Sequence, residues 1–134
     1  PERFAAAASF SGAVDMGRRI QESPAERQQE MRRTFGDLGK FGGSDNDLVH
    51  IAEQLAASGQ PVPRLFLSCG TEDFLYENNL GFRDHLTGLA LDLTYEEGPG
   101  AHDWTYWDQQ IVRCLAWLGV QSLEDVTGIS SIPA

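Results

Sequence analysis

Histidine, cysteine and basic residues are scarce in this 134-residue chain, and each shortage bears on a class of function. The three histidines are not spaced as metal ligands, so no metal site is predicted. Ten lysines and arginines stand against 20 acidic residues, and the net charge of −10 argues against binding to nucleic-acid phosphates. No apolar run reaches the roughly 18 residues of a membrane-spanning helix. We therefore expect no cofactor, no nucleic acid and no membrane among the partners.

The two cysteines are predicted to be free and buried. Cys69 closes an apolar run that is typical of a strand, and Cys114 lies on the apolar stripe of a helix. A thiol nucleophile at Cys69 is an alternative, although the residue lacks a surrounding G-x-C-x-G turn. Two cysteines do not determine the cellular compartment, and a cytoplasmic location is the default prediction.

Length and composition predict one domain in which strands and helices alternate. Apolar runs bounded by turn residues indicate strands, and apolar residues at i, i+3 and i+4 indicate helices. The expected order is strand 4–10, helix 24–35 with Ser23 as its N-cap, helix 48–58, strand 65–69, helix 77–89, strand 91–96, helix 103–118 and a polar tail at 120–134. This alternation predicts an α/β fold, a three-layer sandwich with parallel strands and flanking helices.

Two further expectations concern helix packing and the surroundings of a site. The last helix is predicted to bury one apolar stripe, which consists of Trp104, Trp107, Ile111, Cys114, Leu115 and Leu118. Residues 16–47 are expected to form a cap over the site, which Phe35 or Phe41 would line.

Two glycine-rich loops follow neighbouring predicted strands, and each carries a side chain that suits acid–base chemistry. The first is Cys69-Gly-Thr-Glu-Asp73 and the second is Gly98-Pro-Gly-Ala-His102. Because parallel strands end at one edge of a sheet, we expect Asp73 and His102 to lie close together. A carboxylate that accepts the Nδ1 proton of an imidazole orients that ring as a general base. The loops therefore predict a catalytic pair.

Structural interpretations of the same residues remain open. Asp73 can instead cap the following helix, His102 can be a polar loop residue, and Glu72 competes for the role of the acid. The order acid, then histidine, is that of α/β-hydrolase triads, in which a serine in a G-x-S-x-G turn comes first. No such turn occurs, and Ser9, Ser11 and Ser68 all lack it. We therefore expect the nucleophile outside this chain.

Three segments resemble the esterase D family of α/β hydrolases, which includes S-formylglutathione hydrolases and bacterial tributyrin or acetyl esterases. They are residues 1–4 with 11–15, residues 69–78, and the histidine loop with its tryptophans at 95–107. The resemblance implies that residues 1–134 are the C-terminal half of one α/β-hydrolase domain. It implies that Asp73 is the acid and His102 the base. The nucleophile and the oxyanion hole would lie before Pro1.

The resulting hypothesis is a serine carboxylesterase that acts on small-molecule, short-chain acyl esters. This chain would supply Asp73 and His102, and a missing N-terminal half would supply the serine, so the chain alone is expected to be inactive. An exposed sheet edge and apolar surface favour self-association, so a homo-oligomer is a further expectation. The alternative is a truncated or degenerate hydrolase domain that acts as a non-catalytic interaction module.

Overall fold

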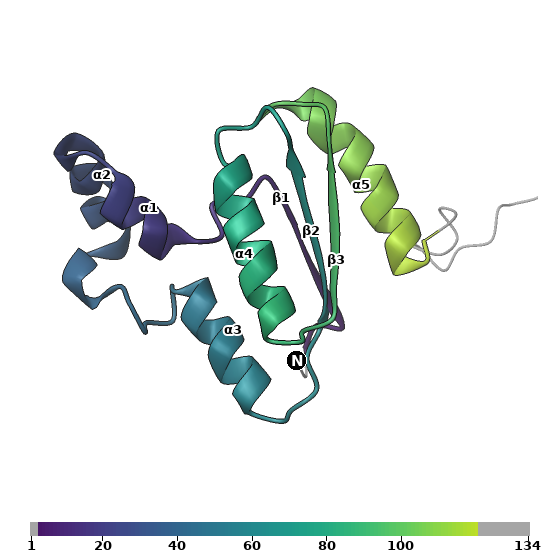
Figure 1. Cartoon of the computed structure of the whole chain (residues 1–134), viewed down its shortest axis with the longest axis horizontal. Coiled ribbons are helices and arrows are strands. Elements are labelled where there is room, and N and C mark those ends of the chain that lie inside the picture. Colours follow the sequence, from purple (N-terminus) through teal and green to yellow (C-terminus); the bar gives the residue numbers. More distant parts are fainter. Residues whose placement is uncertain (1–2, 121–134) are drawn as a thin grey trace, which may run out of the picture.

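The chain folds around a three-stranded parallel sheet, which a computed structural model describes for residues 3–120 (Figure 1). The strands are β1 (Ala6–Phe10), β2 (Arg64–Gly70) and β3 (Leu93–Gly98), in the order β1-β2-β3. Ala8 pairs with Phe66, which in turn pairs with Thr94. The central strand β2 is apolar along most of its length because both of its faces are covered, as in other parallel sheets.

Helices cover both faces of the sheet, which confirms the predicted α/β class (Figure 1). They are α1 (Met16–Glu22), α2 (Ala25–Phe35), α3 (Leu48–Ala57), α4 (Tyr76–Gly88) and α5 (Trp104–Leu118), with a short 3₁₀ helix η1 (Leu38–Lys40). The α3/α4 face holds the core cluster of Val14, Ala52, Leu67, Phe82 and Leu86. On the α5 face, the ring of Phe66 packs on Trp117 at 5.4 Å.

Aspartates begin three of the α-helices. The side chain of Asp15 accepts from the amide of Arg18, that of Asp47 from His50, and that of Asp103 from Tyr106. The predicted N-cap at Ser23 is wrong, because Asp15 already starts an additional helix, α1, and Ser23 ends it. Pro24 then occupies the N-cap position of α2, without a side-chain cap bond.

The inward face of α5 differs from the predicted apolar stripe. Tyr106, Gln110 and Cys114 are buried, whereas Trp104, Ile111, Leu115 and Leu118 are exposed. Two polar contacts fix this orientation: a 3.1 Å hydrogen bond between the Tyr106 and Ser68 hydroxyls, and a 3.0 Å bond that Trp117 donates to Thr94 Oγ1. The helix therefore presents its most apolar side to solvent.

The last strand and the tail of the chain differ from the rest in how they relate to the prediction. The third strand begins at Leu93 rather than Leu91, and the predicted tail lies outside the described residues except for Val120. Within residues 3–120, no helix is both long and apolar enough to cross a bilayer.

Candidate active site

The acid loop and the histidine loop are in direct contact at the carboxyl ends of β2 and β3. The amide of Thr71 donates to the carbonyl of Gly98 at 2.9 Å, and that of Glu72 donates to Gly100 at 3.0 Å. A side chain at Gly70 would collide with the carbonyl group of Gly100. Gly100 has a φ of +149°, and a Cβ there would lie 2.6 Å from the Tyr106 side chain. Glycine at both positions lets the loops approach this closely.

This contact brings Asp73 and His102 together. The Nδ1 atom of His102 lies 3.0 Å from Oδ2 and 3.2 Å from Oδ1 of Asp73, whose side chain is fully buried. Asp73 Oδ1 also accepts from the amide of Leu75 at 2.8 Å, so the carboxylate supports the start of α4 as well. Glu72 is exposed, and its backbone is what meets the histidine loop. The catalytic roles of the pair stay a prediction.

Two aromatic rings flank the imidazole. Phe74 lies 4.7 Å from it, and Trp107 meets it edge-on at 4.9 Å, both measured between ring centroids. The sequence does not predict these neighbours of the imidazole, although each lies within five residues of a member of the pair. With Nδ1 held by Asp73 and the ring packed between two aromatics, Nε2 is the nitrogen left for chemistry.

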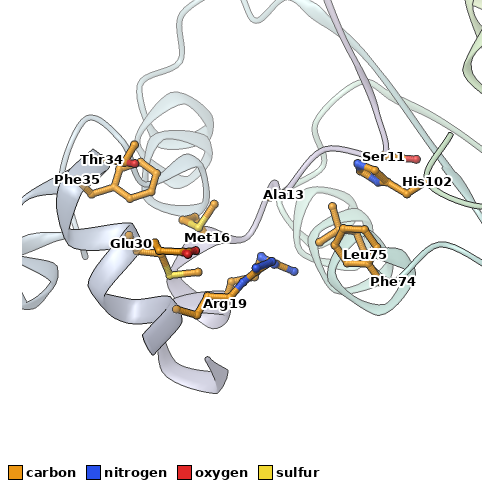
Figure 2. Close-up of a pocket in the computed structure, with 12 residues that line it drawn as sticks. Ser11, Ala13, Met16, Arg19, Glu30, Thr34, Phe35, Phe74, Leu75 and His102 are labelled. Atoms are coloured by element: carbon orange, nitrogen blue, oxygen red, sulfur yellow. The ribbon is translucent and has the colours of Figure 1, made fainter. Parts of the chain in front are cut away.

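A cavity of about 510 Å³ opens beside His102 (Figure 2). Its other lining residues are Ser11, Ala13, Met16, Arg19, Arg27, Glu30, Met31, Thr34, Phe35, Phe74 and Leu75. Helices α1 and α2 form the wall opposite His102, as expected of a cap. Phe35 lines the cavity, whereas Phe41 does not: it is buried, and its ring makes an edge-to-face contact with Phe35 at 5.2 Å between centroids.

Ser11 is the serine that lines the cavity together with His102. Its φ of +52° is unusual for a residue with a side chain, and its hydroxyl is buried without a hydrogen-bond partner among the described residues. In this part of the chain, no serine hydroxyl makes a hydrogen bond with His102. Ser11 therefore does not complete a triad in this structure.

The thiol of Cys69 is poorly suited to nucleophilic attack. Burial, and then the nearby carboxylate of Asp73, raise the pKa of this thiol to about 11, and the side chain is fully inaccessible. Both cysteines are free and buried. Across residues 3–120, no three His, Cys, Asp or Glu side chains gather into a group that could hold a metal ion.

Comparisons with known proteins point to esterases. The chain is 34% identical over 87 residues to an acetyl esterase of Caldicellulosiruptor saccharolyticus. The structure resembles an S-formylglutathione hydrolase, FrmB, of Staphylococcus aureus, with a TM-score of 0.71 and 32% identity over 85% of this chain. It also resembles FphF, a fluorophosphonate-binding serine hydrolase of the same organism, with a TM-score of 0.73 and 31% identity over 89%. No family model matches the chain.

These relatives are longer than this chain. The match to the acetyl esterase includes 65% of this chain and 33% of the esterase. The structural matches cover 44% of FrmB and 46% of FphF. A likeness to a ferulic acid esterase, at 19% identity and a TM-score of 0.58, supports the fold alone. The chain therefore resembles part of an esterase with the α/β-hydrolase fold, as the two loop motifs indicate.

Proposed function

We propose that this chain is the acid- and base-bearing part of a serine carboxylesterase that hydrolyses short-chain acyl esters. The observation that carries the proposal is the 3.0 Å contact between His102 Nδ1 and the buried Asp73 carboxylate, at the rim of a cavity. The similarity to an acetyl esterase and to serine hydrolases supports an ester as the substrate. Within the esterase D family, the sequence of residues 71–77 is more similar to the bacterial short-chain (tributyrin-type) esterases than to the formylglutathione hydrolases.

In this mechanism, Asp73 keeps the imidazole proton on Nδ1 and leaves Nε2 as the acceptor. Nε2 takes the proton of a serine hydroxyl as the oxygen attacks the ester carbonyl, and it returns that proton to the leaving alcohol. Water then attacks the acyl-enzyme, with His102 again as base. The Asp73 carboxylate stabilises the imidazolium that forms in each half-reaction.

The serine and the oxyanion donors belong, in this proposal, to a segment outside the chain. The longer relatives support such a segment, and so does the position of β1, which pairs only with β2 among the described strands. This segment would be the missing N-terminal half that the loop motifs predict. The cytoplasmic location stays a prediction.

The first experiment measures the histidine tautomer in the 134-residue chain by ¹⁵N NMR. We expect the neutral His102 ring to carry its proton on Nδ1, and the Asp73→Asn variant to lose this preference because the amide does not enforce it. Glu72→Gln, a matched loss of one negative charge in the same loop, should leave the tautomer unchanged. An Nε2-protonated His102 in the unaltered chain would contradict the proposal.

The second experiment compares the chain with the gene product extended upstream of Pro1. The extended protein should react with a fluorophosphonate, and Asp73→Asn should lower its kcat by about 10³- to 10⁴-fold. The 134-residue chain should not hydrolyse p-nitrophenyl acetate. Turnover by the chain itself, abolished in His102→Ala, would refute the shared-site arrangement. A start codon upstream without a G-x-S-x-G turn would support the interaction module instead.

A further inference from the structure

The basic residues of this acidic chain are concentrated next to the proposed active site. Residues 16–35, which form α1 and α2, contain five of the ten lysines and arginines but only three of the 20 acidic residues. This segment is therefore positively charged, whereas the rest of the chain is strongly negative. It also forms the cavity wall that faces His102 (Figure 2).

Arg19 is the cation of this segment that is best placed to meet a ligand. It extends from α1 into the cavity, where Figure 2 shows its guanidinium between α2 and Phe74. The guanidinium carbon lies 5.8 Å from the centroid of the Phe74 ring, and the residue is half-buried. It forms no ion pair with any described residue. By contrast, its neighbour Arg18 points elsewhere and pairs with Glu22 at 2.7 Å.

The other charged groups of the cavity leave a positive balance. Arg27 on α2 lines the cavity and makes no ion pair within the described residues. Glu30, the one acidic residue of the lining, pairs with neither arginine in that part of the chain. The remaining wall near Arg19 is apolar and includes Met16, Met31 and Phe35.

The distance between Arg19 and His102 suits a short substrate. Both groups contact the same Phe74 ring, at 5.8 Å and 4.7 Å from its centroid, so they lie within about 10.5 Å of each other. A molecule with its ester carbonyl at His102 and a carboxylate on Arg19 therefore needs only a few methylene groups between them. The apolar side chains of the wall would pack on those methylene groups.

We propose that Arg19 determines specificity, and that the cavity selects esters whose acyl or alcohol part carries a carboxylate. This inference rests on the proposed esterase function. It follows from a half-buried guanidinium, which has lost part of its hydration and gains most from an anionic partner. The net positive charge of residues 16–35 would also attract a carboxylate to this site.

The test uses two probes that match in shape and differ in charge, pentanoate and pentanamide, with the 134-residue chain. Pentanoate should produce saturable NMR shifts at the Arg19 Nε–H and the Trp107 indole N–H, and pentanamide should bind at least about fivefold more weakly. Arg19→Gln should remove this preference. Arg18→Gln, which changes the net charge equally one residue away, should preserve it. Equal binding of the probes, or equal effects of the two variants, would overturn the proposal.

The result separates this inference from the proposed function. The His102 tautomer is measured without a probe. The tautomer prediction can therefore fail while the preference for pentanoate is observed, and the preference can be absent while the tautomer prediction holds. In the extended protein, a monoester of a dicarboxylic acid should have a lower KM than the same ester with its free carboxylate replaced by a neutral carboxamide. Arg19→Gln should raise that KM about fivefold or more and raise the KM of a neutral acetyl ester by a smaller factor, whereas Arg18→Gln should affect neither ester. A fall in kcat for both esters would instead indicate a structural role for Arg19.

Discussion

At the scale of single residues, burial decides which groups near the site are chemically available. Asp73 and Cys69 lie four positions apart, and both side chains are inaccessible to solvent. The carboxylate has two hydrogen-bonded partners, His102 Nδ1 and the amide of Leu75, whereas burial holds the thiol of Cys69 in its neutral form. The same buried environment therefore holds the Asp73 carboxylate in place to orient His102 and makes the Cys69 thiol unreactive.

The raised pKa of Cys69 makes the stability of the chain depend on alkaline pH. A thiol whose pKa is 9.0 when unfolded and about 11 when folded contributes fully below pH 9, and its contribution is lost as pH rises toward 11. Between pH 7.5 and pH 10.5, the free energy of unfolding should fall by about 2 kcal/mol more in the unaltered chain than in Cys69→Ala. Urea unfolding at both pH values measures this difference. The pKa of Tyr95 and of Tyr106 is also raised by burial, but these groups are common to both proteins. Parallel pH profiles would show that Cys69 does not titrate as inferred.

At the scale of elements, two buried asparagines on α4 hold the segment that leads from β1 to α1. The side chain of Asn78 donates to the carbonyl of Asp15 at 2.8 Å and accepts from the amide of the same residue at 3.1 Å. Asn79 donates to the carbonyl of Gly12 at 3.0 Å. These bonds fix the start of α1, and with it the position of Arg19 in the cavity.

Replacement of Asn78 by alanine should therefore destabilise the chain and disturb the cavity. The amide of Asp15 would lose its partner in a partly buried place, and the carbonyl would keep only the 3.3 Å bond from the amide of Arg19, which together costs about 1–3 kcal/mol. Chemical denaturation gives the loss of stability, and NMR shifts at Arg19 report the movement of α1. Asn46→Ala, on an exposed loop, serves as the control and should change stability by less than about 0.5 kcal/mol. Equal effects of the two substitutions would contradict this role of Asn78.

Local signals account for the elements that the sequence predicts correctly. The three strands and four helices, α2 to α5, each have an apolar pattern, a capping aspartate or a terminating glycine. Helix α1 is short and contains Gly17 and two arginines, so only Asp15 marks its start. The face of α5 is not predictable from apolarity, because contacts of Tyr106 and Trp117 with the sheet outweigh the burial of larger side chains.

The residues of the candidate site also fall into those that the sequence predicts and those that it does not. Asp73 and His102 are predictable as neighbours because the topology of a parallel sheet brings strand ends together. Arg19 and Trp107 are not predictable as neighbours of His102, because their positions depend on how α1 and α5 pack. Phe74 follows Asp73 in the acid loop, but no local pattern predicts that its ring turns toward the imidazole.

At the scale of the whole molecule, the described part of the chain leaves two apolar surfaces uncovered. Strand β1 pairs on one side only, and its sequence of three alanines, Ser9 and Phe10 has no charge or proline that would oppose pairing with another strand. The second surface is the exposed stripe of α5, which is defined by Trp104, Ile111, Leu115 and Leu118. Contiguous apolar surfaces of this kind are typical of sites that another chain covers.

We therefore expect the 134-residue chain to self-associate when its proposed N-terminal partner is absent. Sedimentation velocity over a range of concentrations should show a monomer in equilibrium with larger species. Ala8→Lys places a charge on the β1 edge, and Leu115→Lys places one on the α5 stripe. The variant that weakens association by about tenfold or more identifies the surface used, because like charges meet across a symmetric contact. Gln109→Lys adds the same charge to an exposed polar position of α5 and should have no effect. A chain that stays monomeric at every concentration, and unfolds cooperatively, would show that neither surface needs a partner.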